Sequence, residues 1–267
     1  MNDFPGTETE LDAGPGFLGR TAVVMPALDE EASVGSAVRH WVGWEVAEVR
    51  VADNGSRDTT ADRAREAGAR VVGEPRRGYG AAAWAGARSL SEGIDWILFA
   101  SADGSDFLDE ESAAAFDGAV KAGAGLVVGE RVTRPDARRN LTPAQRFGNA
   151  LCCGLIALGW RAPRFRDMGS LRLIRRDVFE ALALRDRAFG WNIEMQVAAI
   201  ERGVAIAEVP VGYRPRTAGQ PKISGSLAGV FRAGRGILGT LAKLWWRKRA
   251  RAGLFVPATG RRGTVRE

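Results

Sequence analysis

The sequence has only two cysteines and one histidine among its 267 residues. Cys152 and Cys153 are adjacent, and adjacent cysteines are poorly placed to bridge each other, so no disulfide framework is predicted. This cysteine usage fits a reducing compartment such as the cytoplasm. His40 has no cysteine or glutamate cluster near it in the sequence, so we predict a structural role for it rather than metal binding.

Long hydrophobic runs are also missing. A membrane-spanning helix needs roughly 18 or more apolar residues, whereas the longest candidate, Leu151 to Trp160, is shorter and contains two glycines. No basic stretch followed by an apolar one stands near the N-terminus, which excludes a secretory signal peptide. We therefore expect a cytoplasmic protein without a membrane span.

Several nucleotide- and nucleic-acid-binding signatures are absent as well. The chain has no helix-turn-helix, zinc-finger or RNA-binding pattern, so no nucleic-acid partner is expected. No Gly-Lys-Ser/Thr follows the glycines at positions 78 and 80, so this segment is not a Walker loop. The turn after the first predicted strand lacks Gly-x-Gly-x-x-Gly, which disfavours a dinucleotide oxidoreductase.

The charge of the chain is positive and unevenly distributed. The formal net charge is +6, and four cations gather within residues 247–251. A basic surface suits nucleotide phosphates or a phospholipid surface. Trp245 and Trp246 precede this basic run, and tryptophan favours membrane interfaces, so the C-terminal helix is a candidate for peripheral contact with the inner face of a membrane. A solvated basic helix end beside a packed tryptophan pair is the alternative.

The order of the apolar segments predicts the fold class. Strands are predicted at 21–25, 46–52, 69–72, 96–99, 126–129, 171–174 and 205–209. One helix is predicted to follow the acidic residues at 29–31 and to end at 41, and further helices are predicted at 59–67, 80–90, 110–122, 143–158, 176–182, 192–201 and 227–249. Strands that alternate with helices predict an α/β fold with a Rossmann-like, mainly parallel sheet covered on both faces.

The composition along the chain suggests one domain with flanking segments. Residues 1–19 are rich in Gly, Pro and acidic side chains and are predicted to be a flexible leader. A single domain is expected over 20–250, with a nucleotide-binding half (20–131), an acceptor-side half (132–225) and a C-terminal helix (226–250). A polar tail follows at 251–267.

Four of the predicted strands are followed by segments that contain polar or charged residues. These segments hold Pro26, Ala27, Asp29 and Glu30 after the first strand, Asp53, Asn54, Gly55, Ser56 and Asp58 after the second, Asp103 and Asp106 after the fourth, and Arg131 after the fifth. In open parallel sheets, ligands bind beyond the carboxyl ends of the strands. We therefore predict that these side chains gather at one ligand site.

Two of these segments, and a third at 76–80, suggest particular chemistry. Asp103 follows a very apolar strand, where a carboxylate can hold a divalent ion through hard oxygen ligands, although an Asp-Gly turn is the alternative. Asp53 is suited to accept hydrogen bonds from a base or a ribose, or to shape a turn. The segment at 76–80, Arg-Arg-Gly-Tyr-Gly, opens a helix to which an anion can come close, or is a flexible turn.

An ordered series of motifs resembles known enzymes. The motifs are VMPALDEE (24–31), DNGSRDTT (53–60), RGYG (77–80), ADGS (102–105), DMGSLR (167–172), FGWNIEMQ (189–196), EVPV (208–211), YRPR (213–216) and KISG (222–225). Together they resemble family 2 glycosyltransferases, which are inverting enzymes of the GT-A fold. Within that family, the chain is similar to the branch around dolichyl- and polyprenyl-phosphate sugar synthases. The resemblance covers about residues 20–240.

The resemblance implies roles for individual residues. Donor binding is implied for Pro26, Ala27, Asp29, Glu31, Asp53, Asn54, Ser56, Arg77, Gly78, Ala102, Asp103 and Arg131. Acceptor binding is implied for Arg146, Arg172, Arg214, Arg216, Lys222 and Ser224, the last four on a mobile loop. Asp103 would also be the ligand of a catalytic Mg²⁺ or Mn²⁺. Trp191 and Glu194 would line the sugar or acceptor pocket.

The need for a general base depends on the acceptor. A phosphate acceptor is already nucleophilic, whereas a hydroxyl needs a base, and Glu194 and Asp167 are the two candidates. For both, a buried carboxylate paired with an arginine is the alternative.

Two departures from the family pattern affect these expectations. Ser101 stands where the family usually has a second Asp, and a neutral hydroxyl is a weaker metal ligand. Many relatives in this branch carry one or two membrane spans after the final helix, and none is expected here, which favours a soluble acceptor more than in those relatives.

The sequence thus predicts a metal-dependent transferase that uses a nucleotide diphosphate sugar. UDP-glucose is the first expected donor and GDP-mannose the second, and the acceptor is either a polyprenyl phosphate or a soluble small molecule. Ser101 motivates an alternative of another class, a non-catalytic module that binds a nucleotide sugar or a lipid phosphate.

Overall fold

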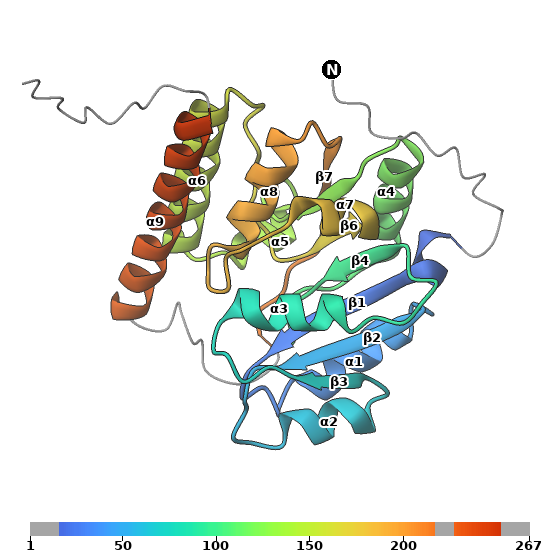
Figure 1. The fold of residues 1–267 in the computed structure, drawn as a ribbon. Coiled ribbons are helices and arrows are strands. Elements are labelled where there is room, and N and C mark those ends of the chain that lie inside the picture. Colours follow the sequence, from blue (N-terminus) through green and yellow to red (C-terminus); the bar gives the residue numbers. More distant parts are fainter. Residues whose placement is uncertain (1–15, 217–226, 252–267) are drawn as a thin grey trace, which may run out of the picture.

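The computed structural model describes residues 16–216 and 227–251. Within them, seven strands form one sheet in the order β3-β2-β1-β4-β6-β5-β7 (Figure 1). The strands are β1 (Thr21–Ala27), β2 (Glu48–Asp53), β3 (Arg70–Gly73), β4 (Trp96–Phe99), β5 (Leu126–Glu130), β6 (Arg172–Arg175) and β7 (Ile206–Pro210). Each falls on a segment that the apolar pattern predicted as a strand.

Strand direction creates one edge at which most loops meet. β1 pairs in parallel with β2 and β4, β2 with β3, and β5 with β7, whereas β6 is antiparallel to both β4 and β5. All strands except β6 therefore end at the same side of the sheet, called here the carboxyl edge. The sheet is mainly parallel, as the sequence predicted.

Helices cover both faces of the sheet because its strands are apolar on both sides. Val23 and Met25 of β1 join one core with α1 (Val34–Val42), α2 (Thr60–Glu66) and α4 (Glu110–Lys121). Ala22 and Val24 join the other core with α3 (Tyr79–Arg88), α7 (Arg176–Leu182) and α8 (Trp191–Glu201). Alternate residues of a strand point to opposite faces, so β1 contributes to both cores. Gly86 allows α3 to approach β1, because a Cβ there would lie 2.5 Å from Val24 Cγ1.

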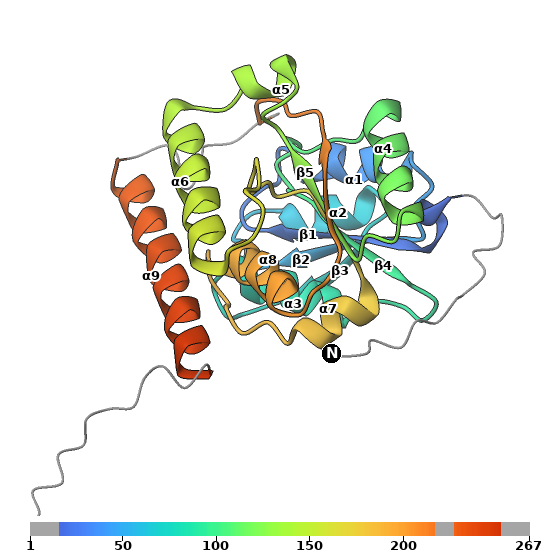
Figure 2. The ribbon, with the colours of Figure 1, turned by 90° about the horizontal axis from the view of Figure 1, so that it is seen from above.

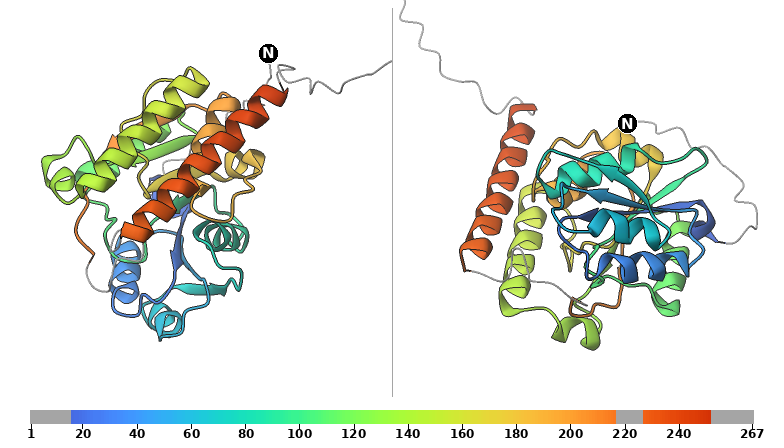
Figure 3. Two further views of the ribbon diagram at one scale, coloured as in Figure 1. Left: turned by 90° about the vertical axis from the view of Figure 1, so that its left-hand side faces the viewer. Right: turned by 90° about the horizontal axis from the view of Figure 1, so that it is seen from below.

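A further layer lies outside α8 on one side of the molecule. α6 (Pro143–Trp160) and α9 (Leu227–Arg251) run next to each other there, as Figure 2 and the left view of Figure 3 show. Buried side chains of α6, α8 and α9 form a third apolar cluster. This cluster includes Cys152 and Cys153, which are buried free thiols, so the prediction that they do not bridge is confirmed. No described helix combines the length and hydropathy that a bilayer crossing requires.

Short elements outside the predicted set complete the described chain. α5 (Pro135–Arg139) is a helix that the sequence pattern did not predict, and η1 (Phe17–Arg20) is a single 3₁₀ turn. The first three residues of the turn fall within the predicted leader, but Phe17 and Leu18 pack against the first core because they are apolar. Residues 1–15 of the predicted leader and 252–267 of the predicted tail lie outside the described residues.

Candidate functional site

The loops that follow β1 and β2 are joined to each other at the carboxyl edge. Asp29 Oδ1 accepts the N–H of Arg57 at 2.8 Å, and the N–H of Asp29 donates to Ser56 Oγ at 2.9 Å. Glu31 Oε2 accepts both the N–H of Thr59 at 3.1 Å and its hydroxyl at 2.8 Å. Asp29 and Glu31, both predicted to bind the donor, therefore also fix the shape of the two loops.

The ends of β1 and β2 lie beside each other under these loops. Pro26 and Ala27 are the last residues of β1, and the register pairs Ala27 with Asp53 at the end of β2. Asp53 Oδ1 accepts both the N–H of Ser56, at 3.2 Å, and its hydroxyl. The structure thus brings these predicted donor residues together at one place.

Asn54 connects the loop after β2 to the loop before α3. Its side-chain nitrogen donates to the carbonyl oxygens of Glu74 at 2.9 Å and Arg76 at 2.7 Å. Its side-chain oxygen accepts the N–H of Gly78 at 2.7 Å. Gly78 has φ +145°, and a Cβ there would lie 2.0 Å from the carbonyl oxygen of Arg187. Only glycine fits this close approach, so the glycine has a structural reason in addition to its implied donor role.

Asp103 meets an arginine from a distant segment at the carboxyl edge. Ala102 before it is buried, whereas the Asp103 side chain retains 17% of its exposure. Its Oδ1 accepts the N–H of Ser105 at 2.9 Å and the hydroxyl at 2.6 Å. Its Oδ2 lies 3.5 Å from Arg216 Nε, and Arg216 also forms an ion pair with Glu30. Burial alone lowers the pKa of Arg216, but Glu30 and Asp103 raise it above its ordinary value.

Asp106 belongs to the same loop and is buried. Its Oδ2 accepts the N–H of Ser101 at 2.9 Å, and its Oδ1 accepts the hydroxyl of Ser170 at 3.0 Å. Burial raises the pKa of Asp106, and the nearby Asp103 carboxylate raises it further. Both Asp106 oxygens therefore have partners within the protein.

Arg131 and Asp167 form a buried two-point ion pair. Arg131 Nε lies 2.7 Å from Asp167 Oδ2, and Nη2 lies 2.9 Å from Oδ1. The backbone N–H of Arg131 donates to Oδ2 at 2.9 Å, and the guanidinium carbon lies 4.9 Å from the centroid of the Tyr213 ring. Burial alone raises the pKa of Asp167, but Arg131 outweighs it and holds the pKa below its ordinary value. Asp167 is therefore a poor proton acceptor near neutral pH.

A cationic pocket of about 370 Å³ opens between the 184–190 loop and α9. Its charged lining is Arg77, Arg185, Arg187, Lys243 and Arg247 against Asp186 and Glu194. Glu194 Oε2 accepts the backbone N–H groups of Arg185 at 2.8 Å and Asp186 at 2.6 Å. Glu194 Oε1 lies 3.6 Å from Arg247 Nη1. Burial lowers the pKa of Arg187, and the positive charge of Arg76 lowers it further. Five cations against two carboxylates favour an anionic ligand in this pocket.

Two predicted site residues lie in the interior of the protein. Trp191 is fully buried and contacts Trp84, Phe99 and Phe179 in an aromatic cluster. Arg172 is also fully buried, where it donates to the carbonyl oxygens of Gly169 and Asn192. Burial lowers the pKa of Arg172 to about 10. In this conformation, neither side chain reaches the surface at which the other predicted residues gather.

The remaining predicted acceptor residues are dispersed. Arg146 is exposed on α6, where it donates to the carbonyl oxygen of Arg138 at 2.7 Å. Arg214 donates through Nε to the carbonyl oxygen of Gly104 at 2.7 Å, next to Asp103. Lys222 and Ser224 lie outside the described residues.

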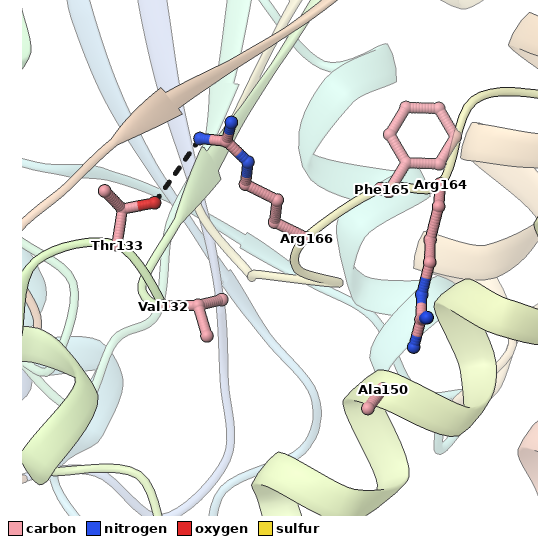
Figure 4. A pocket seen from close by; sticks show the side chains of 6 residues that line it. All are labelled: Val132, Thr133, Ala150, Arg164, Phe165 and Arg166. Atoms are coloured by element: carbon pink, nitrogen blue, oxygen red, sulfur yellow. Dashed lines mark hydrogen bonds between the residues drawn. The ribbon is translucent and has the colours of Figure 1, made fainter.

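A second cavity has a volume of about 360 Å³, and some of its lining residues neighbour Arg131 and Asp167 in the sequence. Its lining combines apolar and cationic side chains, as Figure 4 shows: Val132, Thr133, Ala150, Arg164, Phe165 and Arg166. Arg166 Nη1 lies 3.4 Å from Thr133 Oγ1 across this cavity.

The residues at the carboxyl edge fit a divalent ion only if the substrate completes its coordination. Among residues 16–216 and 227–251, no three His, Cys, Asp or Glu side chains gather as a metal cage. Asp103 presents one carboxylate, while Asp106 Oδ2 accepts the backbone N–H of Ser101. Mg²⁺ is commonly held by one or two carboxylates together with substrate phosphates and water, so one carboxylate at this edge satisfies the protein's part.

Two residues with contacts at the carboxyl edge are missing from the predicted donor set. Glu30 forms an ion pair with Arg216. In the sequence, Glu30 stands in an acidic run with Asp29 and Glu31, and that pattern does not identify which of the three carboxylates faces the site. Tyr213 lies over Arg131 and forms a β-bridge with Asp106, a contact between residues too far apart in sequence for any local pattern to predict.

Comparisons with known proteins identify similar sequences. The family model described as Glycosyl transferase family 2 matches residues 22–183. An uncharacterized glycosyltransferase of Mycobacterium tuberculosis is 35% identical over 208 residues, covering 78% of this chain and 91% of that protein. An undecaprenyl-phosphate mannosyltransferase of Micrococcus luteus is 30% identical over 274 residues, covering 93% and 97%.

A solved structure shares the fold at low sequence identity. Glucosyl-3-phosphoglycerate synthase from Mycobacterium tuberculosis, in complex with Mn²⁺, UDP-glucose and phosphoglyceric acid, superposes with a TM-score of 0.65. The sequences are 23% identical, and the match covers 85% of this chain and 79% of that one. The predicted GT-A architecture is confirmed by this likeness and by the observed sheet.

Proposed function

We propose a function from one premise: the chain belongs to glycosyl transferase family 2 and is a glycosyltransferase. The protein moves a hexose from a nucleoside diphosphate sugar to an anionic acceptor, and the configuration at the anomeric carbon is inverted. The observation that carries the proposal is the meeting of Glu30, Asp103 and Arg216 at the carboxyl edge. These side chains come from three distant segments and offer both signs of charge where ligands of parallel sheets bind.

The donor is proposed to lie over the ends of β1 and β2. Asp29, Glu31 and Asp53 border that place, and the glycine-rich turn at Gly78 leads from it to the cationic pocket. UDP-glucose is the first donor to test, since the glucosyl-3-phosphoglycerate synthase structure contains it. GDP-mannose is the second, by analogy with the mannosyltransferase relative.

Asp103 is proposed to hold a Mg²⁺ or Mn²⁺ ion together with the donor diphosphate. When bound, such an ion stabilises the negative charge that develops on the departing nucleoside diphosphate. Arg216 Nε lies 3.5 Å from Asp103 Oδ2 and would have to move if that oxygen held the ion. Arg216 then remains close enough to contribute positive charge of its own to the leaving group.

The anionic group of the acceptor is proposed to bind in the cationic pocket. Arg77, Lys243 and Arg247 line it, and Glu194 holds the loop at 185–186 through two backbone N–H groups. Asp167 is engaged at both oxygens by Arg131 and is unsuited to act as a base. A phosphate nucleophile, which needs no strong base, therefore suits this site better than a neutral hydroxyl.

The test is the release of nucleoside diphosphate from UDP-glucose or GDP-mannose in the presence of Mn²⁺. Asp103→Ala is expected to lower the rate at least about a hundredfold, because it removes a group that acts on the charge of the transition state. Asp117→Ala is the matched control, since Asp117 pairs with Lys121 on the surface of α4. Full activity of the Asp103 variant would remove the site assignment.

The alternative, a non-catalytic binding module, is favoured by Ser101. It predicts that a nucleotide sugar raises the melting temperature, because the ligand binds only the native state, while no nucleoside diphosphate is released. Measuring both quantities on one preparation distinguishes the two functions.

A further inference from the structure

The outer layer formed by α6 and α9 exposes large apolar side chains. On α6 these are Phe147, Leu151 and Leu158, and on α9 they are Leu238, Trp245 and Trp246. Leu158 is 80% exposed, Phe147 71% and Trp246 52%. Single exposed apolar residues are common on soluble proteins, but a group of them on adjacent elements marks an interaction surface. These six residues are called here the docking face.

The helical repeat places the α6 residues on one stripe. Phe147, Leu151 and Leu158 are separated by four and seven positions, which returns each to nearly the same side of the helix. Ile156 lies on the opposite side of the helix and is buried in the third core, which also contains Cys152. The exposed stripe is therefore not an extension of the core, and it faces away from the protein.

The α9 residues continue the same surface. Leu238 and Trp245 are seven positions apart, and Trp245 Cδ1 lies 3.7 Å from the position of a Cβ on Gly159 of α6. Lys248 Nζ donates to the carbonyl oxygen of Gly159 at 2.8 Å, so the C-terminal ends of the two helices adjoin. The left view of Figure 3 shows both helices presented on one side of the molecule.

The charge of the two helices has a single sign. Neither α6 nor α9 contains Asp or Glu in its sequence, whereas α9 has seven Lys and Arg residues. Arg249 is exposed and lies with its guanidinium carbon 3.8 Å from the Trp245 ring centroid. Arg235 and Lys243 are exposed as well. Tryptophan with Lys and Arg beside an apolar stripe is the composition of helices that lie in the interface of anionic membranes.

We propose that the docking face binds the surface of a membrane that contains anionic phospholipids. The exposed leucine, phenylalanine and tryptophan side chains enter the headgroup region, and the exposed Arg235 and Arg249 lie against the lipid phosphates. Lys243, which lines the cationic pocket, stands three positions before Trp246 and therefore lies on the same side of α9. The face thus brings that pocket to the membrane surface, where a lipid-borne phosphate can reach it. This last step rests on the proposed function, whereas membrane binding itself does not.

Vesicle flotation tests the proposal directly. The full chain is mixed with vesicles of phosphatidylcholine alone or of phosphatidylcholine with phosphatidylglycerol. The wild type is expected to float with the mixed vesicles and to stay in solution with the neutral ones. Arg249→Gln is expected to weaken the partition about fivefold. The double variant Leu158→Ser/Trp246→Ser is expected to weaken it at least about tenfold for each residue, because each change removes a large buried apolar group.

Matched variants on the opposite side of the molecule control for general effects. Val42 on α1 is 46% exposed, and Arg65 on α2 is an exposed partner of Asp62. Val42→Ser and Arg65→Gln are expected to leave flotation unchanged. The melting temperatures of all variants are compared, and only variants that melt like the wild type are interpreted.

Three results would overturn the proposal. The first is that the wild type floats equally with neutral and mixed vesicles, and the second is that the Leu158/Trp246 double variant floats like the wild type. The third is that the wild type sediments as a dimer and the same double variant sediments as a monomer. The last result would assign the face to a second copy of the chain. Release of nucleoside diphosphate is measured on the same variants and is expected to persist without vesicles, so a failure of the transferase function is seen separately from a failure of docking.

Discussion

Replacing Arg131 by methionine tests the buried ion pair between Arg131, for which the resemblance implies donor binding, and Asp167, a candidate base. The change keeps most of the apolar volume and removes the guanidinium from Asp167, whose side chain has no exposure. The carboxylate is then buried without its counter-ion, and breaking such a pair costs about 3–5 kcal/mol of the free energy of unfolding. For a chain of this size, the melting temperature should fall by roughly 6–20 °C, since each kcal/mol corresponds to roughly 2–4 °C.

A double-mutant cycle separates the pair from the rest of the site. Asp167→Asn keeps an oxygen that accepts the backbone N–H of Arg131 while it removes the charge. The double variant should lose less stability than the sum of the single variants, with a coupling of at least about 2 kcal/mol, because neither charge is then left unpaired. Arg175→Met is the control, since Arg175 forms the same two-point pair with Asp177 at the surface. It should cost less than about 1 kcal/mol.

The assay is urea unfolding followed by circular dichroism, together with donor turnover. If Arg131→Met lowered the free energy of unfolding no more than Arg175→Met, or if the single changes were additive, the pair would not stabilise the fold and the reasoning from burial would be refuted. A stable variant with an increased KM for the donor would instead favour direct phosphate contact by Arg131.

Two further predictions concern backbone geometry and pH. Gly78→Ala should lower the free energy of unfolding by about 3 kcal/mol, because the new Cβ would overlap a neighbouring backbone oxygen. Gly93 also has a positive φ, but a Cβ there would meet nothing within 4 Å, so Gly93→Ala should cost about 1 kcal/mol in the same denaturation assay. Equal losses would contradict the close approach. The stability difference between the wild type and Asp167→Asn should be constant above the ordinary pKa of 3.8. It should be lost as the pH falls through the lowered folded-state pKa of Asp167, which melting curves across the acid range would measure.

The strands and long helices could be predicted from the sequence because they depend on local patterns. The segment at 96–99 is apolar at every position, as a strand buried on both faces must be, and the alanine-rich segment at 80–90 favours a helix. The short helix α5 was missed because five residues carry too little periodicity to be recognised. The antiparallel direction of β6 could not be predicted, since direction depends on how the chain returns to the sheet and not on the strand's own residues.

The candidate site shows the same division. Asp103 and Asp53 could be identified because parallel strands end at one edge, and the residues after those strands must gather there. The partners of each side chain could not, because they are distant in sequence: Arg216 reaches Asp103, and Glu194 lies beside Arg247. Trp191 lies in the same recognisable motif as Glu194, and only the packing of α8 against the sheet reveals that the ring is buried.

The sequence by itself determined the α/β class and the set of residues at the strand ends, because these follow from local patterns of apolar and polar residues. The family followed from the ordered series of motifs that resembles known members. Tertiary structure alone decided which carboxylates have partners, that α9 closes a cationic pocket, and that α6 and α9 present one apolar surface. The physical reason is that burial and ion pairing depend on distances between side chains, and those distances arise only when segments far apart in the chain pack together.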